Sequence, residues 1–232
     1  MKFRVFRFDP ENDCDPYFDE FDLPVEKGMT VLEGLYYILE NLDSSLAFRS
    51  SCRCAICGSC SMYINGQFRL ACRTLIANLE TDMVSIRPLS NLPILKDLVV
   101  DMKPFFENYK LIEPYLIPKE QPPEKEYYQS LQNREKIDGS IDCLLCGICY
   151  GACPTVSLRK DYLGPAAITK TFRFITDSRD GAMEKRLAVV ATEDGIYRCH
   201  TIFNCQKFCP KDIDPSDYIS QLKRKVVWQL FK

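Results

Sequence analysis

The sequence lacks the residues and patterns on which many enzymes depend. Its 232 residues include a single histidine, His200, and no Ser/His/Asp or metal–water constellation can be argued from them. The Gly-rich fingerprint G-x-G-x-x-G is also absent. A flavin or nicotinamide site is therefore expected on a partner and not on this chain.

Long apolar runs and a strong charge of either sign are missing as well. No run of about 18 apolar residues occurs, which argues against a transmembrane helix. The net charge of −2 gives no reason to expect nucleic acid. Residues 1–8 read as a strand, and we see no secretory signal or transit peptide. Hydrophobic residues make up 46% of the chain, enough for the cores of two modest domains.

Cysteine, in contrast, is abundant, with 13 in the chain. Residues 143–154 contain a complete C-x2-C-x2-C-x3-C-P run, and residues 199–210 repeat its spacing with Ile202 in place of the second cysteine. Such runs are typical of bacterial-type iron–sulfur segments, in which the fourth cysteine of each run ligates the other cluster. Structural zinc, which prefers isolated C-x2–4-C pairs, fits this spacing less well.

This ligand exchange predicts two unlike clusters. Since isoleucine cannot coordinate iron, the run with Ile202 leaves one iron position without a protein ligand, and a [3Fe–4S] cluster is expected there. The predicted ligands are Cys143, Cys146, Cys149 and Cys209 for a [4Fe–4S] cluster, and Cys153, Cys199 and Cys205 for the [3Fe–4S] cluster.

A third motif near the N-terminus has the plant-type C-x4-C-x2-C spacing of a [2Fe–2S] site. Its predicted ligands are Cys52, Cys57, Cys60 and Cys72. Asn65-Gly66, a favoured two-residue hairpin turn, would carry Cys72 back to the cysteine loop. Gly58 would let backbone N–H groups approach the cluster sulfurs.

Cys54 offers a competing interpretation of this motif. With Cys57 and Cys60 it forms C-x2-C-x2-C, the start of a four-iron motif, but the Cys-Pro partner is missing nearby. The plant-type interpretation leaves Cys54 and Cys14 without a ligand role. A disulfide framework is disfavoured by the length of the chain, the odd cysteine count and the missing secretory signal, so a reducing compartment is expected.

The pattern of the remaining residues predicts an α+β protein with two domains. Residues 1–100 are expected to form a β-grasp plant-type [2Fe–2S] domain, and residues 101–232 an all-α bacterial-type ferredoxin domain with two clusters. The expected elements are strands over 2–8, 18–25, 62–64, 68–70 and 84–87, helices opened by Thr30, Pro165 and Asp214, a helical pattern over 95–109 kinked at Pro104, and an extended surface segment over 114–126. The last helix is expected to bury Ile219, Leu222, Val226 and Val227.

The order of the three cysteine motifs resembles the iron–sulfur subunit of succinate dehydrogenase and fumarate reductase. The stretches Ala47–Cys52, Gly164–Ala167, Asp177–Asp180 and Tyr197–Ile202 support this resemblance. It implies an oxidoreductase subunit of the respiratory chain and tricarboxylic acid cycle, which passes electrons between an FAD-containing flavoprotein subunit and a membrane quinone. It also implies peripheral attachment to the cytoplasmic side of the cell membrane by anchor subunits, with or without heme.

The same resemblance implies a quinone pocket beside the three-iron cluster. Pro154, His200 and Ile202 match positions of that pocket, and Thr155, also assigned to it, stands where many members have Ser. Residues 156–158, Val-Ser-Leu, replace an aromatic pair found in many ubiquinone-reactive members, which leaves room for menaquinone. The direction of turnover, the quinone and the number of anchor subunits are left open.

Two alternative functions agree less well with the sequence. An iron–sulfur subunit of a glycolate oxidase or heterodisulfide reductase type would carry two complete four-iron runs, and Ile202 argues against it. A simple diffusing electron carrier is disfavoured by the length of the chain and its mixed cluster types.

Overall fold

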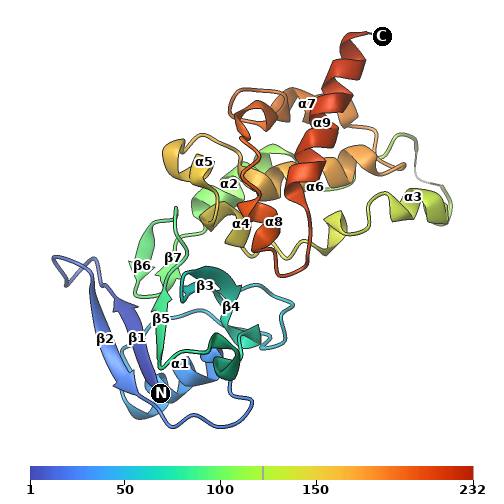
Figure 1. Ribbon diagram of the computed structural model, residues 1–232. Coiled ribbons are helices and arrows are strands. Elements are labelled where there is room, and N and C mark those ends of the chain that lie inside the picture. The colour runs from blue at the N-terminus through green and yellow to red at the C-terminus, as the bar shows by residue number, and fades with distance from the viewer. Residues whose placement is uncertain (122, 232) are drawn as a thin grey trace. The chain divides into compact units, whose positions relative to one another are not determined.

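The computed structural model describes residues 1–121 and 123–231 (Figure 1), and the chain separates into two units. The first unit consists of Met1–Met102 and Leu144–Gly151, and the second of Lys103–Cys143 and Ala152–Lys232. Within the described residues, the strands belong to the first unit, whereas the second unit is helical.

A mixed five-stranded sheet forms the centre of the first unit. Its strand order is β2-β1-β5-β3-β4, with β1 parallel to β5 and the other neighbouring pairs antiparallel. Alternate residues of the two central strands are completely buried, with Phe3 opposite Val84 and Val5 opposite Ile86. The strands are β1 (Lys2–Arg7), β2 (Tyr17–Asp22), β3 (Ser61–Ile64), β4 (Gln67–Leu70) and β5 (Met83–Arg87).

Local sequence signals correctly placed the helix and the hairpin of this unit. Helix α1 (Val31–Asn41) begins at the predicted capping box, in which Glu33 N donates to Thr30 Oγ1 at 3.2 Å and Thr30 N donates to Glu33 Oε2 at 2.7 Å. Asn65 and Gly66 connect β3 to β4, both with positive φ, as a two-residue hairpin turn requires.

The helical pattern predicted over residues 95–109 is wrong in its first half. Strands β6 (Ile94–Lys96) and β7 (Val99–Val100) form a hairpin there, and helix α2 (Lys103–Leu111) begins only after it. Pro104 occupies the first turn of α2, where its missing N–H removes no helical hydrogen bond, so the predicted kink is also wrong.

Asp97 explains why the chain turns at this point. It has a left-handed φ of +46° and is 2% exposed. Its carboxylate accepts hydrogen bonds from Arg7 Nε at 3.1 Å, Phe8 N at 3.0 Å and Ala47 N at 2.9 Å. Because these partners are distant in sequence, the periodicity of residues 95–109 carries no trace of them. The same contacts tie the segment before the first cysteine motif to the sheet.

The second unit is built around helix α6 (Gly164–Thr176), which is buried along nearly all of its length. It packs against α2, α7 and α9. Pro165 lies in its first turn, as predicted. The other helices are α3 (Leu131–Glu135), α5 (Pro154–Leu158), α7 (Met183–Val190), α8 (Asn204–Lys207) and α9 (Pro215–Leu230), whereas α4 (Ile148–Gly151) belongs to the first unit.

Helix α9 begins as predicted, because Asp214 caps it by accepting from Ser216 N and Asp217 N, both at 3.0 Å. Its predicted apolar stripe is too long: Ile219 and Leu222 are buried, but Val227 is 51% exposed. No described helix has both the length and the apolar character needed to cross a membrane.

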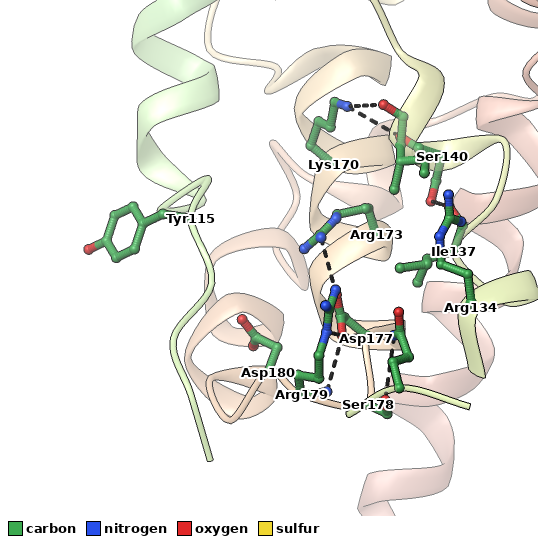
Figure 2. A network of polar contacts seen from close by, with 12 residues as sticks. Tyr115, Arg134, Ile137, Ser140, Lys170, Arg173, Asp177, Ser178, Arg179 and Asp180 are labelled. Carbon is green, nitrogen blue, oxygen red and sulfur yellow. Dashed lines mark hydrogen bonds and ion pairs between the residues drawn. The ribbon is translucent and has the colours of Figure 1, made fainter. Parts of the chain in front are cut away.

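The segment over 114–126 contains no helix or strand among its described residues and is largely exposed, as predicted; Pro122 lies outside the described residues. Pro118 forms an isolated antiparallel bridge with Asp180. Next to this bridge, Arg173 and Arg179 converge on the buried Asp177 (Figure 2), at 3.1 and 2.8 Å from its Oδ2. Burial acts to raise the pKa of Asp177. The two arginines, Arg179 above all, nevertheless hold this pKa below its usual value.

Candidate metal centres

The loop with the first cysteine motif directs backbone N–H groups at its own sulfur atoms. Cys52 Sγ accepts from the amides of Cys54, Ile56 and Cys57 at 3.5, 3.3 and 3.2 Å. Cys57 Sγ accepts from the amides of Cys52 and Ser59 at 3.4 and 3.5 Å. Such a ring of amides stabilises negative charge on sulfur. These amides, that of Cys54 first, lower the pKa of the Cys52 thiol to about 6.

The other two predicted ligands of this motif are held by the hairpin. Ala71 N donates to Cys60 O at 2.9 Å, and Cys72 N donates to Cys60 Sγ at 3.4 Å. The hairpin therefore returns Cys72 to the cysteine loop, as the Asn-Gly turn predicted. Cys60 is the most buried thiol of the four, and burial raises its pKa to about 12.

Gly58 has a role beyond the one predicted. Its φ of +71° is left-handed, and a Cβ built there would lie 2.5 Å from Cys146 Cβ and 2.9 Å from Cys146 Cα. The glycine therefore permits the close approach of two segments within the first unit, both of which contain predicted ligands. The amide of the next residue, Ser59, donates to Cys57 Sγ at 3.5 Å, in keeping with the predicted approach of backbone N–H groups to sulfur.

The two thiols without a predicted ligand role, Cys14 and Cys54, are exposed. A hydrogen bond to Cys52, more than any other influence, raises the pKa of Cys54. Cys54 therefore lies beside the predicted ligands, and we expect it to be dispensable all the same.

In the second unit, the three predicted [3Fe–4S] ligands come together, Cys153 from the complete run and Cys199 and Cys205 from the interrupted run. The charges of Cys199 and Cys153 act on the buried Cys205, whose pKa is raised to about 12, mainly by burial. Thr201 N donates to Cys199 Sγ at 3.4 Å. These three thiols are the donor set that the sequence predicts for the [3Fe–4S] cluster.

A small pocket adjoins these three thiols. All four residues predicted for the quinone pocket line it, together with the three cysteines, so the structure brings these two predicted sets to one place. Thr155 is buried, whereas Pro154, His200 and Ile202 are exposed, Ile202 at 49%. The residues that line the pocket include Cys153, Pro154, Thr155, His200, Ile202 and Cys205.

Sequence reasoning missed the polar contacts that hold this loop. Asn204 Nδ2 donates to Ala152 O at 3.0 Å, and Lys223 Nζ donates to Cys199 O at 3.4 Å. Phe203 has a φ of +65° and is 52% exposed at the edge of the pocket. These contacts join residues far apart in sequence, and a left-handed φ is unusual for phenylalanine, so the sequence did not predict this loop conformation.

The predicted four-iron ligands divide between the two units, with Cys146 and Cys149 in the first and Cys143 and Cys209 in the second. Within the second unit the pKa of Cys209 is raised, first by burial and to a lesser degree by the charge of Cys143. Among the described residues, no group of three or more His, Cys, Asp or Glu is spaced to hold a single metal ion. The donor chemistry, thiols with inward amides, fits iron–sulfur clusters.

A mixed sheet with a thiol loop, followed in the chain by two further cysteine runs and a helical unit, defines an iron–sulfur electron-transfer protein of the two-ferredoxin class. Residues 2–107 match a family described as a 2Fe-2S iron-sulfur cluster binding domain, and residues 139–213 a family described as a 4Fe-4S dicluster domain. The chain belongs to the family of succinate dehydrogenase iron–sulfur subunits, as two further comparisons show.

The chain is 40% identical to the succinate dehydrogenase iron-sulfur subunit of Paracoccus denitrificans, over 97% of this chain and 88% of that protein. It superimposes on a chain of the Mycobacterium smegmatis Sdh1 complex in the apo form with a TM-score of 0.91 at 26% identity, covering 100% of this chain and 97% of that chain. A hypothetical protein from Helicobacter pylori, at 16% identity and a TM-score of 0.58 over 96% of this chain and 39% of that chain, shares the fold alone. The chain is thus an electron-transfer subunit of an oxidoreductase.

Replacing single cysteines of the first motif tests its ligand assignment. Cys54→Ser should retain the EPR signal of the reduced [2Fe–2S] cluster, because the exposed Cys54 thiol is not among the four plant-type ligands. Cys57→Ser should abolish or strongly alter that signal. Loss of the signal in the Cys54 variant would favour the four-iron spacing that begins at Cys54.

Proposed function

We propose that the chain passes electrons between an FAD-containing flavoprotein subunit and a membrane quinone through [2Fe–2S], [4Fe–4S] and [3Fe–4S] clusters. The clusters would supply one-electron acceptors of differing potential. The observation that carries the proposal is the three-thiol set of Cys153, Cys199 and Cys205, with Ile202 exposed in the same pocket.

The ligand set follows the sequence assignment. The [2Fe–2S] cluster would be held in the amide-lined loop of the first unit, in a β-grasp domain over residues 1–100. The other two clusters would be held in a domain over residues 101–232. There, the fourth cysteine of each run would ligate the cluster that the other run mainly holds. The five-stranded sheet of the first unit and the buried helix α6 of the second support this division.

A quinone beside the three-thiol set is the proposed electron acceptor or donor. Exposed His200 and buried Thr155 supply polar groups suited to a carbonyl oxygen, whereas Pro154 and Ile202 supply apolar surface. Phe203, which lines the pocket, and Leu158, which follows Cys153 in sequence, are both exposed. Exposed apolar residues of this kind are suited to a membrane-anchor partner, which would hold the chain peripherally at the cytoplasmic face.

Reconstitution tests this function directly. The isolated chain should not oxidise succinate with any dye. Adding the flavoprotein should restore dye reduction, and quinone reduction should also need the membrane anchor.

His200→Ala should lower quinone turnover by about tenfold, since a lost hydrogen bond to a polar ligand is worth about 1.5 kcal/mol. Succinate-to-dye activity should stay nearly intact.

A matched control is Gln206→Ala, which changes an exposed residue of the nearby helix α8 outside the pocket lining. It should leave both activities unchanged. If His200→Ala lowered both activities together, His200 would support the cluster or the fold instead. If it lowered neither, the quinone would bind elsewhere.

A further inference from the structure

Lys170 is a buried cation with no role in the function described so far. It lies on α6, is 8% exposed, and points toward the 3-10 helix η3 (Ser140–Asp142) (Figure 2). Its Nζ donates to Ser140 O at 3.3 Å and Ile141 O at 3.2 Å. These carbonyls lie three and two residues before Cys143, the first predicted ligand of the [4Fe–4S] cluster.

The carbonyls alone do not neutralise the charge of Lys170. Among the described residues, no carboxylate lies within 4.0 Å of its Nζ, although Asp142 acts on it from a greater distance. The neighbouring cation Arg173 is itself paired with Asp177 at 3.1 Å. A buried ammonium without an ion pair is costly unless other negative charge lies near it.

The negative charge that acts most strongly on Lys170 belongs to Cys143. Burial, helped by the charge of Arg173, lowers the pKa of Lys170, while negative charge on the Cys143 sulfur and, more weakly, on Asp142 opposes that shift. When Cys143 ligates iron, this negative charge becomes part of the cluster's thiolate shell. The ammonium and the cluster would then face one another in a region of low dielectric, where charges interact strongly.

We propose that Lys170 is a positioning residue that raises the reduction potential of the [4Fe–4S] cluster. Reduction adds one negative charge to the cluster, and a nearby fixed cation stabilises that added charge more than it stabilises the oxidised form. The two carbonyl contacts hold the ammonium in place on the Cys143 side. This inference rests on the proposed ligand set, in which Cys143 belongs to the [4Fe–4S] cluster.

The test is a redox titration of the complete complex, followed by EPR, with separate midpoints for the three clusters. Lys170→Met and Lys170→Gln should lower the midpoint potential of the [4Fe–4S] cluster. At a fixed potential, the ratio of reduced to oxidised cluster should fall about tenfold, which corresponds to a shift of about 59 mV for a one-electron couple. Lys170→Arg, which keeps the charge, should stay near the wild type. The [2Fe–2S] midpoint should not move.

Two comparisons separate the charge from a purely structural contact. Gln can still donate to the Ser140 and Ile141 carbonyls, so an unchanged midpoint in Lys170→Gln with a shifted one in Lys170→Met would overturn the inference. The control Lys185→Met removes an exposed lysine of the same unit, paired with Glu113. Because solvent screens that site, it should leave the midpoint unchanged.

The outcomes also separate this inference from the proposed function. An unchanged midpoint in both neutral variants, with a normal [4Fe–4S] signal, would overturn the role of Lys170 and leave the ligand set standing. If Lys170→Met failed to incorporate the cluster, Lys170→Gln would decide the question by its midpoint. A wild-type complex without a [4Fe–4S] signal would instead refute the ligand set itself.

Discussion

Ile202→Cys is expected to convert the three-iron cluster of this chain into a four-iron cluster. Ile202 occupies the vacant second position of the interrupted run and lines the same pocket as Cys153, Cys199 and Cys205. A fourth thiolate there would complete the ligand set that a [4Fe–4S] cluster requires. The EPR signal of the oxidised three-iron cluster should disappear, and a [4Fe–4S] signal should replace it on reduction.

The substitution should also lower the midpoint potential of that cluster, because cluster type and thiolate charge both set the potential. Quinone reduction should therefore slow, whereas succinate-to-dye activity should persist. Ile202→Ala provides the control, since it shortens the same exposed side chain without adding a thiol. An unchanged three-iron signal in a folded Ile202→Cys protein would show that residue 202 does not face the cluster.

Gly58→Ala is expected to disrupt the cluster region of the first unit. The added Cβ would come within 2.5 Å of Cys146 Cβ and 2.9 Å of Cys146 Cα, in addition to the strain of a φ of +71°. Backbone atoms of a ligand segment cannot yield as the end of a flexible side chain can, so the two loops must separate. The iron and labile sulfide content should fall, and the reduced [2Fe–2S] and [4Fe–4S] EPR signals should both weaken.

Gly28→Ala is the matched control for this experiment. Gly28 has a similarly left-handed φ of +87°, but an added Cβ would meet nothing within 4 Å. This variant should bear the backbone strain alone, about 1–2 kcal/mol, and keep its full iron content. Equal loss of iron in the two variants would contradict the close-approach role of Gly58.

Short-range signals account for what could be predicted from the sequence. The Thr30 capping box, the Asn65-Gly66 turn and the Asp214 cap each act within four residues, and each was found as predicted. The cysteine spacings predicted the grouping of thiols in the first loop and around Cys205 in the same way. Such features need no knowledge of the rest of the fold.

The predictions that were wrong or incomplete depend on contacts between distant residues. Asp97 turns the chain because Arg7, Phe8 and Ala47 donate to it, and a helical spacing of apolar residues hid that turn. Gly58 is a glycine because of Cys146, 88 positions away in sequence. The environment of Lys170 likewise follows only from the packing of α6 against η3.

The EPR spectrum of the oxidised wild-type complex tests the central claim most directly. In that state the [2Fe–2S] and [4Fe–4S] clusters are EPR-silent, whereas a [3Fe–4S] cluster has one unpaired spin. Three unlike clusters in one chain predict a single signal of about one spin per chain, which is lost on reduction. An oxidised complex with full iron content and no such signal would contradict the account.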